Sequence, residues 1–353
     1  MATNQNESIL QAKNLSVNFR TYRGEVKALQ NVDLEIFRHE VLALVGESGC
    51  GKSVTALTIL GLLPPNGHVT EGEILLNGTD LLKKTGDEMR YVRSREIATI
   101  FQDPMTYLNP VLTIAMQLKE SFLVRNDFPL SLDQSIEEFL ATNSSTEPTR
   151  VHGRQREGIA EQLSVELLKL VRLPDPERVM KQYPYELSGG MRQRCMIAMA
   201  LARRPALLIA DEITTALDVT IQAQVLSLLM GLRDTMDAST LLITHDLSIA
   251  AETANRIAVM YAGNIVEVAS TRELFRKPLH PYTRLLMKCI PDVRKPKVRL
   301  ESIRGNVPDL IDPPNGCRFN PRCPKVMDEC RTVKPALKNC GKDHLVHCFL
   351  YQH

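Results

Sequence analysis

The feature that most constrains this chain is a glycine-rich loop, GESGCGKS at residues 46–53. It fits the pattern G-x-x-x-x-G-K-[ST] and follows a short apolar run, EVLALVG at 40–46. The residues from about Lys52 to Leu62 have the pattern of a helix. Glycines let such a loop curl so that its N–H groups face phosphate oxygens, and the helix presents its positive end to the same anion. Strand, loop and helix in this order predict a nucleotide site.

The residue types of this phosphate loop have distinct expected roles. Lys52 places a cation against the β- and γ-phosphates, and the Ser53 hydroxyl is an expected Mg²⁺ ligand. Cys50 is expected to contribute only its backbone, with a thiol open to oxidation. The residues expected to contact ATP here are Gly46, Glu47, Ser48, Gly49, Cys50, Gly51, Lys52, Ser53 and Val54.

Two acids end another apolar run, ALLIADE at 206–212. We expect Asp211 to hold Mg²⁺ through its water shell and Glu212 to activate the attacking water as general base. Two acids after a strand are common by chance. Their combination with the phosphate loop favours the functional interpretation.

Short β-branched runs alternate with helical stretches, which predicts an α/β fold with a largely parallel sheet. A helix is expected over Thr220–Met236, and helical periodicity replaces strands between residues 104 and 186. Strands are predicted at 8–19, 26–36, 40–46, 72–78, 96–103, 206–212, 239–246 and 255–268, the last with Gly263–Asn264 as its turn.

Composition excludes several classes of protein. The 353 residues carry 43 Lys and Arg against 41 Asp and Glu, which gives a net charge of +2. This near-neutral balance argues against a basic arm that binds nucleic acid and against an acidic tail. No run of about 18 apolar residues occurs, and the N-terminus lacks the basic and apolar regions of a secretory signal. We therefore expect a cytosolic chain with no membrane span.

Further motifs identify a family. LSGGM (187–191) opens a helical run, Gln102 lies in IFQDP, His245 ends LLITH, and TTALD (214–218) follows the two acids. Their order and spacing resemble those of the ATP-binding cassette ATPases from residue 8 to about 275. The resemblance implies a RecA-like parallel-sheet core with an antiparallel β subdomain and a helical subdomain, plus a small cysteine-rich C-terminal domain. The implied divisions are a core at 1–103 and 187–275, a helical subdomain at 104–186 with a polar insertion at about 127–158, and an extension at 276–353.

The resemblance also implies a mechanism in which two cassettes enclose two ATP molecules. His245 would contact the γ-phosphate, Gln102 would bind Mg²⁺ and report its occupancy, and Asp218 would couple the two sites. An aromatic ring upstream of the phosphate loop would stack on adenine; Phe19 is favoured and Tyr22 is the alternative. The residues that would bind the ATP held by the opposite subunit are Leu187, Ser188, Gly189, Gly190 and Met191.

The C-terminal segments HPYTRLLM (280–287), GNVPDL and GCRFNPRCP resemble the extension of oligopeptide/dipeptide (peptide/nickel) importer ATPases, of the D type. Members of that branch carry a [4Fe–4S] cluster, which implies Cys317, Cys323, Cys330 and Cys348 as its ligands. Five, six and seventeen residues separate these cysteines, whereas zinc sites favour C-x₂₋₄-C pairs. Zinc and unmetallated thiols remain alternatives, and Cys340 is a spare cysteine.

The resemblance thus implies an ATP-hydrolysing importer subunit on the cytoplasmic face of the membrane. Its expected partners are a second cassette ATPase, forming a heterodimer, two membrane-spanning permease subunits and an extracellular solute-binding protein, with no nucleic acid. The alternatives are a soluble cassette ATPase acting on nucleic acid or ribosomes, and an exporter ATPase. A single cassette and near-neutral charge oppose the first, and the cysteine-bearing tail opposes the second.

Overall fold

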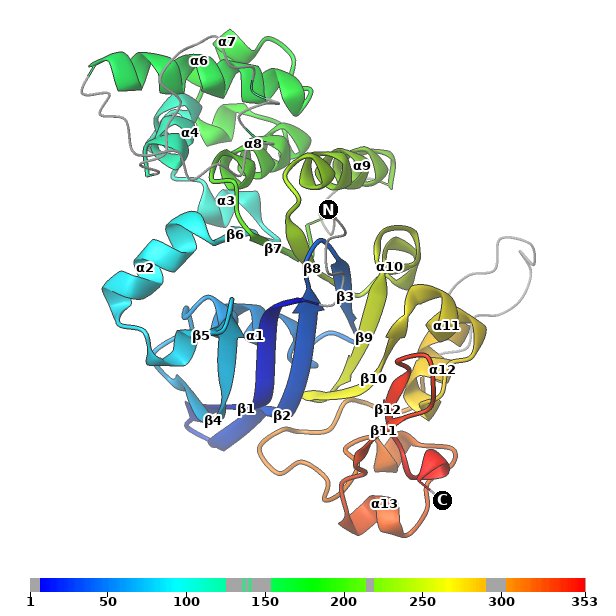
Figure 1. The fold of residues 1–353 in the computed structure, drawn as a ribbon. Helices are drawn as coiled ribbons and strands as arrows, with labels where there is room; N and C mark the ends of the chain where they lie inside the picture. The colour runs from blue at the N-terminus through cyan, green and yellow to red at the C-terminus, as the bar shows by residue number, and fades with distance from the viewer. Residues whose placement is uncertain are drawn as a thin grey trace. The chain divides into compact units, whose positions relative to one another are not determined.

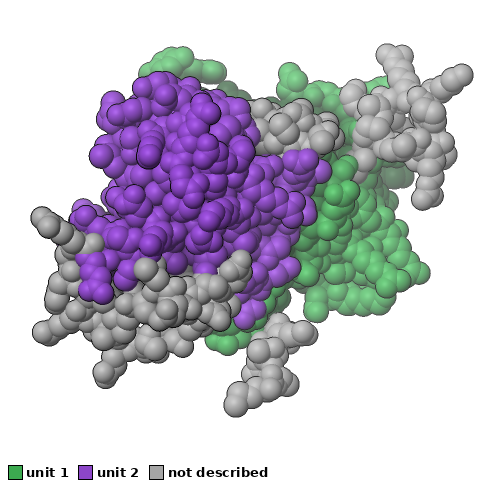
Figure 2. All heavy atoms as spheres, turned by 90° about the horizontal axis from the view of Figure 1, so that it is seen from above, with its two compact units in different colours: residues 1–84, 241–353 green, residues 85–240 purple. Residues whose placement is uncertain are grey.

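The chain forms two compact units, coloured separately in Figure 2. Unit 1 joins residues 1–84 to 241–353, and unit 2 comprises residues 85–240. The polar insertion lies mostly outside the described residues, and so does Asp218. The computed structural model describes residues 7–124, 136, 140, 154–213, 219–289 and 303–352.

Unit 1 contains a four-stranded antiparallel sheet in the order β2-β1-β4-β5 (Figure 1). Its strands are β1 (Ser8–Thr21), β2 (Gly24–Phe37), β4 (Gly67–Leu76) and β5 (Thr79–Asp80). The strands predicted at 8–19, 26–36 and 72–78 are therefore confirmed, as β1, β2 and β4. Buried and exposed residues alternate over parts of β2, as in a sheet with one covered face.

The second sheet of unit 1 runs in the order β11-β12-β10-β9-β3-β8. All five residues of β3 are buried, and β3 pairs in parallel with β9. A continuous apolar run is typical of a parallel strand whose two faces are both covered. The strands are β3 (Val41–Val45), β8 (Ser239–Thr244, whose first two residues belong to unit 2), β9 (Arg256–Tyr261), β10 (Asn264–Ser270), β11 (Leu337–Asn339) and β12 (Leu345–His347).

The helices of unit 1 connect these strands. The predicted helix after the phosphate loop is confirmed as α1, which ends at Ile59, three residues before the expected Leu62. The helices are α1 (Lys52–Ile59), η1 (Leu81–Lys83), α10 (Leu247–Thr253), α11 (Thr271–Arg276), α12 (Pro281–Lys288), η3 (Asn320–Arg322), α13 (Glu329–Thr332) and η4 (Phe349–Tyr351).

The turn between β9 and β10 differs from the prediction. Asn264 pairs with Tyr261, so the turn residues are Ala262 and Gly263 rather than Gly263 and Asn264. Both have positive φ, +47° and +78°. Two consecutive positive φ angles belong to the primed turns, whose twist matches that of a two-residue hairpin. Asparagine tolerates positive φ better than alanine does, so the sequence favoured Asn264 over Ala262 as a turn residue. The predicted turn is therefore one residue too far along the chain.

Unit 2 is mainly helical. Strands β6 and β7 pair in parallel, and helices α4, α6, α7 and α8 pack on one another, as Figure 1 shows. The helical periodicity predicted between residues 104 and 186 is confirmed where the structure describes it. The elements are α2 (Gly86–Arg95), β6 (Ile97–Ile100), α3 (Pro104–Tyr107), α4 (Ile114–Leu123), α6 (Arg154–Leu170), α7 (Pro176–Lys181), η2 (Pro184–Glu186), α8 (Gly189–Ala202), β7 (Leu207–Asp211) and α9 (Val219–Thr235).

Within the described residues, none of the helices combines the length and the apolar character that a bilayer crossing requires.

A buried carboxylate fastens the C-terminal segment to the sheet of unit 1. Glu267, in β10, is wholly buried and accepts hydrogen bonds from the backbone N–H groups of Leu279 (2.7 Å) and His280 (2.8 Å). Its carboxylate also lies 2.6 Å from Nε2 of His344. A buried carboxylate needs several such partners to offset its lost hydration. Glu267 therefore fixes both the start of α12 and the approach to β12.

We expect Gly263→Ala to destabilise the protein far more than Gly78→Ala. The two glycines have nearly equal φ, +78° and +77°, but an added Cβ at Gly263 would lie 2.2 Å from the carbonyl oxygen of Ala28. A Cβ at Gly78 would meet no atom within 4 Å. Gly78→Ala should cost about 1 kcal/mol and Gly263→Ala about 3 kcal/mol or more. Urea unfolding measures both, and equal losses would contradict the steric argument.

Candidate nucleotide site

The phosphate loop lies between β3 and α1, as the sequence predicts. Gly49 and Gly51 have φ of +75° and +109°, in the region where a side chain is strained. A Cβ on Gly46 would lie 2.2 Å from the carbonyl oxygen of Met260. The first glycine is therefore required by close packing, and the other two by the backbone turn.

Lys52 closes the loop on itself. Its Nζ atom donates to the carbonyl oxygens of Gly46 (2.9 Å) and Glu47 (3.1 Å), and the residue is only 4% exposed. Ser53 is exposed at the first turn of α1. The Lys52 ammonium is therefore already held within the loop, and its partners include two neutral carbonyls that an anionic phosphate could replace.

Cys50 does not meet one expectation. Its side chain is fully buried, and this burial raises the pKa of the thiol. A buried thiol with a raised pKa forms little of the reactive thiolate. The expectation that this thiol is open to oxidation is therefore wrong, because the side chain turns into the core beneath the loop.

The two aromatic candidates for adenine stacking differ in their surroundings. Phe19 is half-buried, with its ring against Gly67 in the neighbouring strand β4. Tyr22, in the turn between β1 and β2, is 97% exposed. Phe19 is thus held in place by packing, whereas the protein leaves nearly the whole Tyr22 side chain in water.

Unit 2 brings Gln102 and Glu212 together, although 110 positions separate them. Gln102 follows β6 and Glu212 follows β7, and these strands are parallel neighbours. The Gln102 side-chain amide donates to a carboxylate oxygen of Glu212 over 3.2 Å. Glu212 has φ of +45°, which is uncommon for a residue other than glycine. Strained backbone of this kind concentrates at functional sites.

Asp211 ends β7 and is half-buried. Its charge acts on Tyr107: burial is the larger cause that raises the pKa of this tyrosine, and the negative charge of Asp211 adds to it. Tyr107 stacks on Phe101 with ring centroids 3.5 Å apart and planes 3° from parallel. Asp211 is therefore placed at the carboxyl end of β7, beside an aromatic pair that follows β6.

The LSGGM segment forms the start of α8. Ser188 is the N-cap residue, and its hydroxyl accepts from the N–H of Met191 over 3.3 Å. Leu187 is buried, while Ser188 and Gly189 are exposed and Gly190 is half-exposed. An exposed helix N-terminus with small residues is suited to an approaching anion.

His245 is exposed directly after β8. The next residue, Asp246, caps α10 by accepting from the N–H of Ser248 over 2.7 Å. Its own N–H donates to the hydroxyl of Thr244 over 3.0 Å. These bonds on Thr244 and Asp246 fix the backbone on both sides of His245 and leave its ring at the surface.

The four cysteines proposed as cluster ligands influence one another electrostatically. Burial raises the pKa of Cys317 to about 12, and the charges of Cys330, Cys323 and Cys348 act in the same direction. Cys340 is exposed. Nowhere in the described residues, however, do three or more His, Cys, Asp or Glu side chains form a group that could hold a metal ion. The donor chemistry suits a cluster, and the arrangement of the thiols does not by itself support one.

The two histidines beside the spare cysteine have other partners. His344 pairs with Glu267, and Nδ1 of His347 lies 3.0 Å from the carbonyl oxygen of Pro335. Each of these contacts occupies one ring nitrogen, so only Nδ1 of His344 and Nε2 of His347 are left for any other partner.

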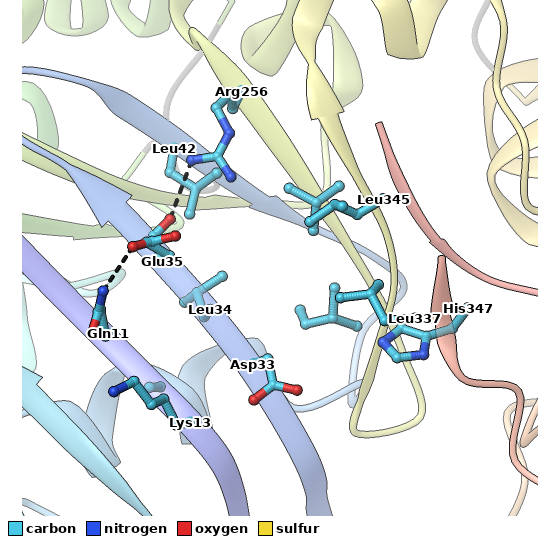
Figure 3. Close-up of a pocket in the computed structure, with 13 residues that line it drawn as sticks. Gln11, Lys13, Asp33, Leu34, Glu35, Leu42, Arg256, Leu337, Leu345 and His347 are labelled. Carbon is cyan, nitrogen blue, oxygen red and sulfur yellow. Dashed lines mark hydrogen bonds between the residues drawn. The ribbon is translucent and has the colours of Figure 1, made fainter. Parts of the chain in front are cut away.

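A cavity of about 230 Å³ lies elsewhere in unit 1. Figure 3 shows Leu34 of β2 on one side of it and Leu337, Leu345 and His347 of the β11–β12 hairpin on the other. No residue of the phosphate loop lines it. This cavity is therefore separate from the candidate nucleotide site.

Comparison with known proteins identifies the family. Residues 29–215 match the ABC transporter family, and residues 266–330 match the oligopeptide/dipeptide transporter C-terminal region. The chain belongs to the ABC transporter family.

Individual members of this ABC transporter family align with nearly the whole chain. The dipeptide transport ATP-binding protein DppD of Bacillus subtilis is 44% identical, over 98% of this chain and 95% of that protein. The oligopeptide transport protein AppD of the same organism is 44% identical, over 98% and 97%. DppD of Escherichia coli is 43% identical, over 94% and 93%.

Solved structures confirm the predicted cassette fold. A dimeric bacterial ABC transporter cassette has 26% identity and a TM-score of 0.60, covering 74% of this chain and 99% of that one. The same cassette in a post-hydrolysis state bound to ADP and phosphate has a TM-score of 0.59 at 26% identity, with the same coverage.

The chain contains no tryptophan, so a single introduced indole can report adenine stacking. We expect the fluorescence of Phe19→Trp to be quenched by ATP, because packing on Gly67 holds this ring in place. Tyr22→Trp should respond weakly. Adding Lys52→Ala to each variant is the control and should abolish any quenching. A strong response from Tyr22→Trp alone would show that adenine stacks on the residue in the β1–β2 turn rather than on Phe19.

Proposed function

We propose that this chain is the ATP-hydrolysing subunit of an importer for dipeptides or oligopeptides. One observation carries the proposal: a single chain joins the ABC transporter match at 29–215 to the oligopeptide/dipeptide transporter C-terminal match at 266–330. Relatives of nearly the same length are named as dipeptide and oligopeptide transport ATP-binding proteins.

The proposed chemistry assigns ATP binding to the phosphate loop. Its backbone N–H groups and Lys52 would hold the β- and γ-phosphates. Ser53 and Gln102, with Asp211 acting through the water shell, would hold Mg²⁺, which would neutralise charge on the phosphates. Glu212 accepts a proton from the attacking water, and the hydrogen bond from Gln102 orients its carboxylate.

The proposed active form pairs this chain with a second cassette ATPase in a heterodimer, this chain being the D-type subunit. Ser188, Gly189 and Gly190 bind the γ-phosphate of ATP held by the opposite subunit, because α8 begins at these exposed and half-exposed residues and a helix N-terminus attracts an anion. His245 contacts the γ-phosphate of this chain's own ATP, and Asp218 couples the two sites. A solved cassette of similar fold is itself dimeric, which supports the pairing of two cassettes.

The remaining partners follow from the transport role. The dimer docks on the cytoplasmic face of two membrane-spanning permease subunits, and an extracellular solute-binding protein delivers the peptide. Loss of the γ-phosphate removes the contacts across the dimer, which opens and moves the permease subunits.

The C-terminal region forms a small cysteine-rich domain in this proposal. Cys317, Cys323, Cys330 and Cys348 would hold a [4Fe–4S] cluster, as the resemblance to the peptide importer branch implies, once their thiols are drawn together. The cluster would tie together a segment with few regular elements, a structural role. Zinc is the alternative, and iron and sulfide analysis of anaerobically purified protein distinguishes the two.

We expect Glu212→Gln to reduce kcat for ATP about 10²- to 10⁴-fold, because the amide cannot accept the proton. ATP affinity should remain close to that of the wild type. Glu177→Gln, an exposed position on α7, is the matched control and should leave both unchanged. The measurement is ATP turnover by the assembled complex. Undiminished turnover by Glu212→Gln would mean either that this residue is not the general base or that the partner's site carries all the turnover.

Purification in mild detergent from native membranes tests the partners. We expect two multi-spanning proteins and a second LSGG-bearing ATPase to accompany the tagged chain, as mass spectrometry would identify. Ribosomal or nucleic-acid-processing factors in the soluble fraction, without a membrane partner, would leave ATP hydrolysis intact and reject the transport role.

A further inference from the structure

An ion pair joins the C-terminal region to the phosphate loop. Arg322, in η3, donates from Nη1 to one carboxylate oxygen of Glu47 (2.7 Å) and from Nη2 to the other (3.1 Å). The Arg322 side chain is 6% exposed and that of Glu47 is 28% exposed. A two-point contact between guanidinium and carboxylate fixes both direction and distance, especially where water is largely excluded.

All five N–H groups of Arg322 have partners. Besides Glu47, Nη1 lies 3.3 Å from the hydroxyl of Tyr261, Nη2 donates to the carbonyl of Ile303 (3.3 Å), and Nε donates to the carbonyl of Arg304 (3.0 Å). A guanidinium with every donor occupied cannot turn without losing several bonds. Arg322 therefore holds Glu47 from a fixed position.

The backbone of Glu47 is held from the same region. Its N–H donates to the hydroxyl of Tyr282 over 3.0 Å. Tyr282 is wholly buried, and its ring packs against Tyr261 and Phe319, with ring centroids 4.7 Å and 5.4 Å apart. The C-terminal region thus contacts both the side chain and the main chain of the second residue of the loop.

The contact matters because Glu47 shapes the rest of the loop. Lys52 donates to the carbonyls of Gly46 and Glu47, so a shift of Glu47 moves a partner of the cation that the proposed function places on the phosphates. The N–H of Cys50 also donates to the carbonyl of Glu47 over 3.3 Å. A displaced Glu47 would alter both bonds within the loop.

We propose that Arg322 and Tyr282 are positioning residues of the nucleotide site, which hold Glu47 so that the phosphate loop is formed before ATP arrives. The C-terminal region would then help to form the ATP site, in addition to following the cassette in the sequence. This inference rests on the proposed function, because it assumes that the phosphate loop binds ATP.

A double-mutant cycle on the full chain tests it. Arg322→Ala and Glu47→Ala should each weaken ATP binding on the order of 10-fold, raising KM more than they lower kcat. Combined, they should weaken it little more than either alone, because Arg322 acts through Glu47. Arg322→Lys keeps the charge but not the two-point contact and should restore part of the affinity. ATP affinity is measured by calorimetric titration.

Two further variants separate positioning from general stability. Arg284→Ala is the control: it removes bonds to Tyr351 and Pro278 in the same C-terminal packing, without a contact to the loop. It should leave ATP affinity unchanged. Tyr282→Phe removes only a hydroxyl and should weaken ATP binding several-fold, which tests the proposal even if Arg322→Ala does not fold.

The outcomes distinguish the two proposals. A wild-type chain that fails to bind ATP would reject the proposed function. Normal ATP binding by a folded Arg322→Ala, or by Tyr282→Phe if the former is unfolded, would overturn only the positioning role. Equal losses from Arg284→Ala, or fully multiplicative losses in the cycle, would overturn it as well.

Discussion

The close packing of the phosphate loop against the end of β9 is the constraint on which unit 1 depends. At Gly46 no side chain fits, because the carbonyl of Met260 occupies the space that a Cβ would need. The N–H of Gly263 donates to the carbonyl of Cys50 over 2.7 Å, so the β9–β10 turn also touches the loop. A loop that must present its N–H groups to an anion has few other bonds of its own. Its shape comes from the elements around it.

In unit 2, neighbouring parallel strands fix the positions of the candidate functional side chains. Residues at the carboxyl ends of neighbouring parallel strands lie side by side, which explains how Gln102 reaches Glu212. The strained backbone at Glu212 turns the chain sharply after β7. Asp211 is the last residue of the buried strand β7 and Glu212 follows it directly, so the strand itself fixes the positions of both acids.

The sequence predicted these strands and loops because their signals are local. Apolar runs such as 40–46 and 206–212 and the glycines of the phosphate loop describe their own conformations. The positive φ of Ala262 and the burial of the Cys50 thiol depend on tertiary packing, and both were mispredicted. The contact of Arg322 with Glu47 joins positions 275 residues apart, and no local pattern indicates it. The phosphate-loop motif indicates the chemistry of the loop, but it does not indicate which distant residues hold the loop in its conformation.

The Glu47–Arg322 contact also has a consequence for how the two positions vary among related proteins. The match to the ABC transporter family ends at residue 215, well before this arginine. Cassettes that lack a C-terminal region of this kind have no Arg322, and a glutamate at the second loop position gains nothing from it there. The two residues should therefore change together among related chains. A cassette exchanged between transporters would need to bring its own C-terminal region, because one half of this ion pair without the other leaves a largely buried charge unpaired.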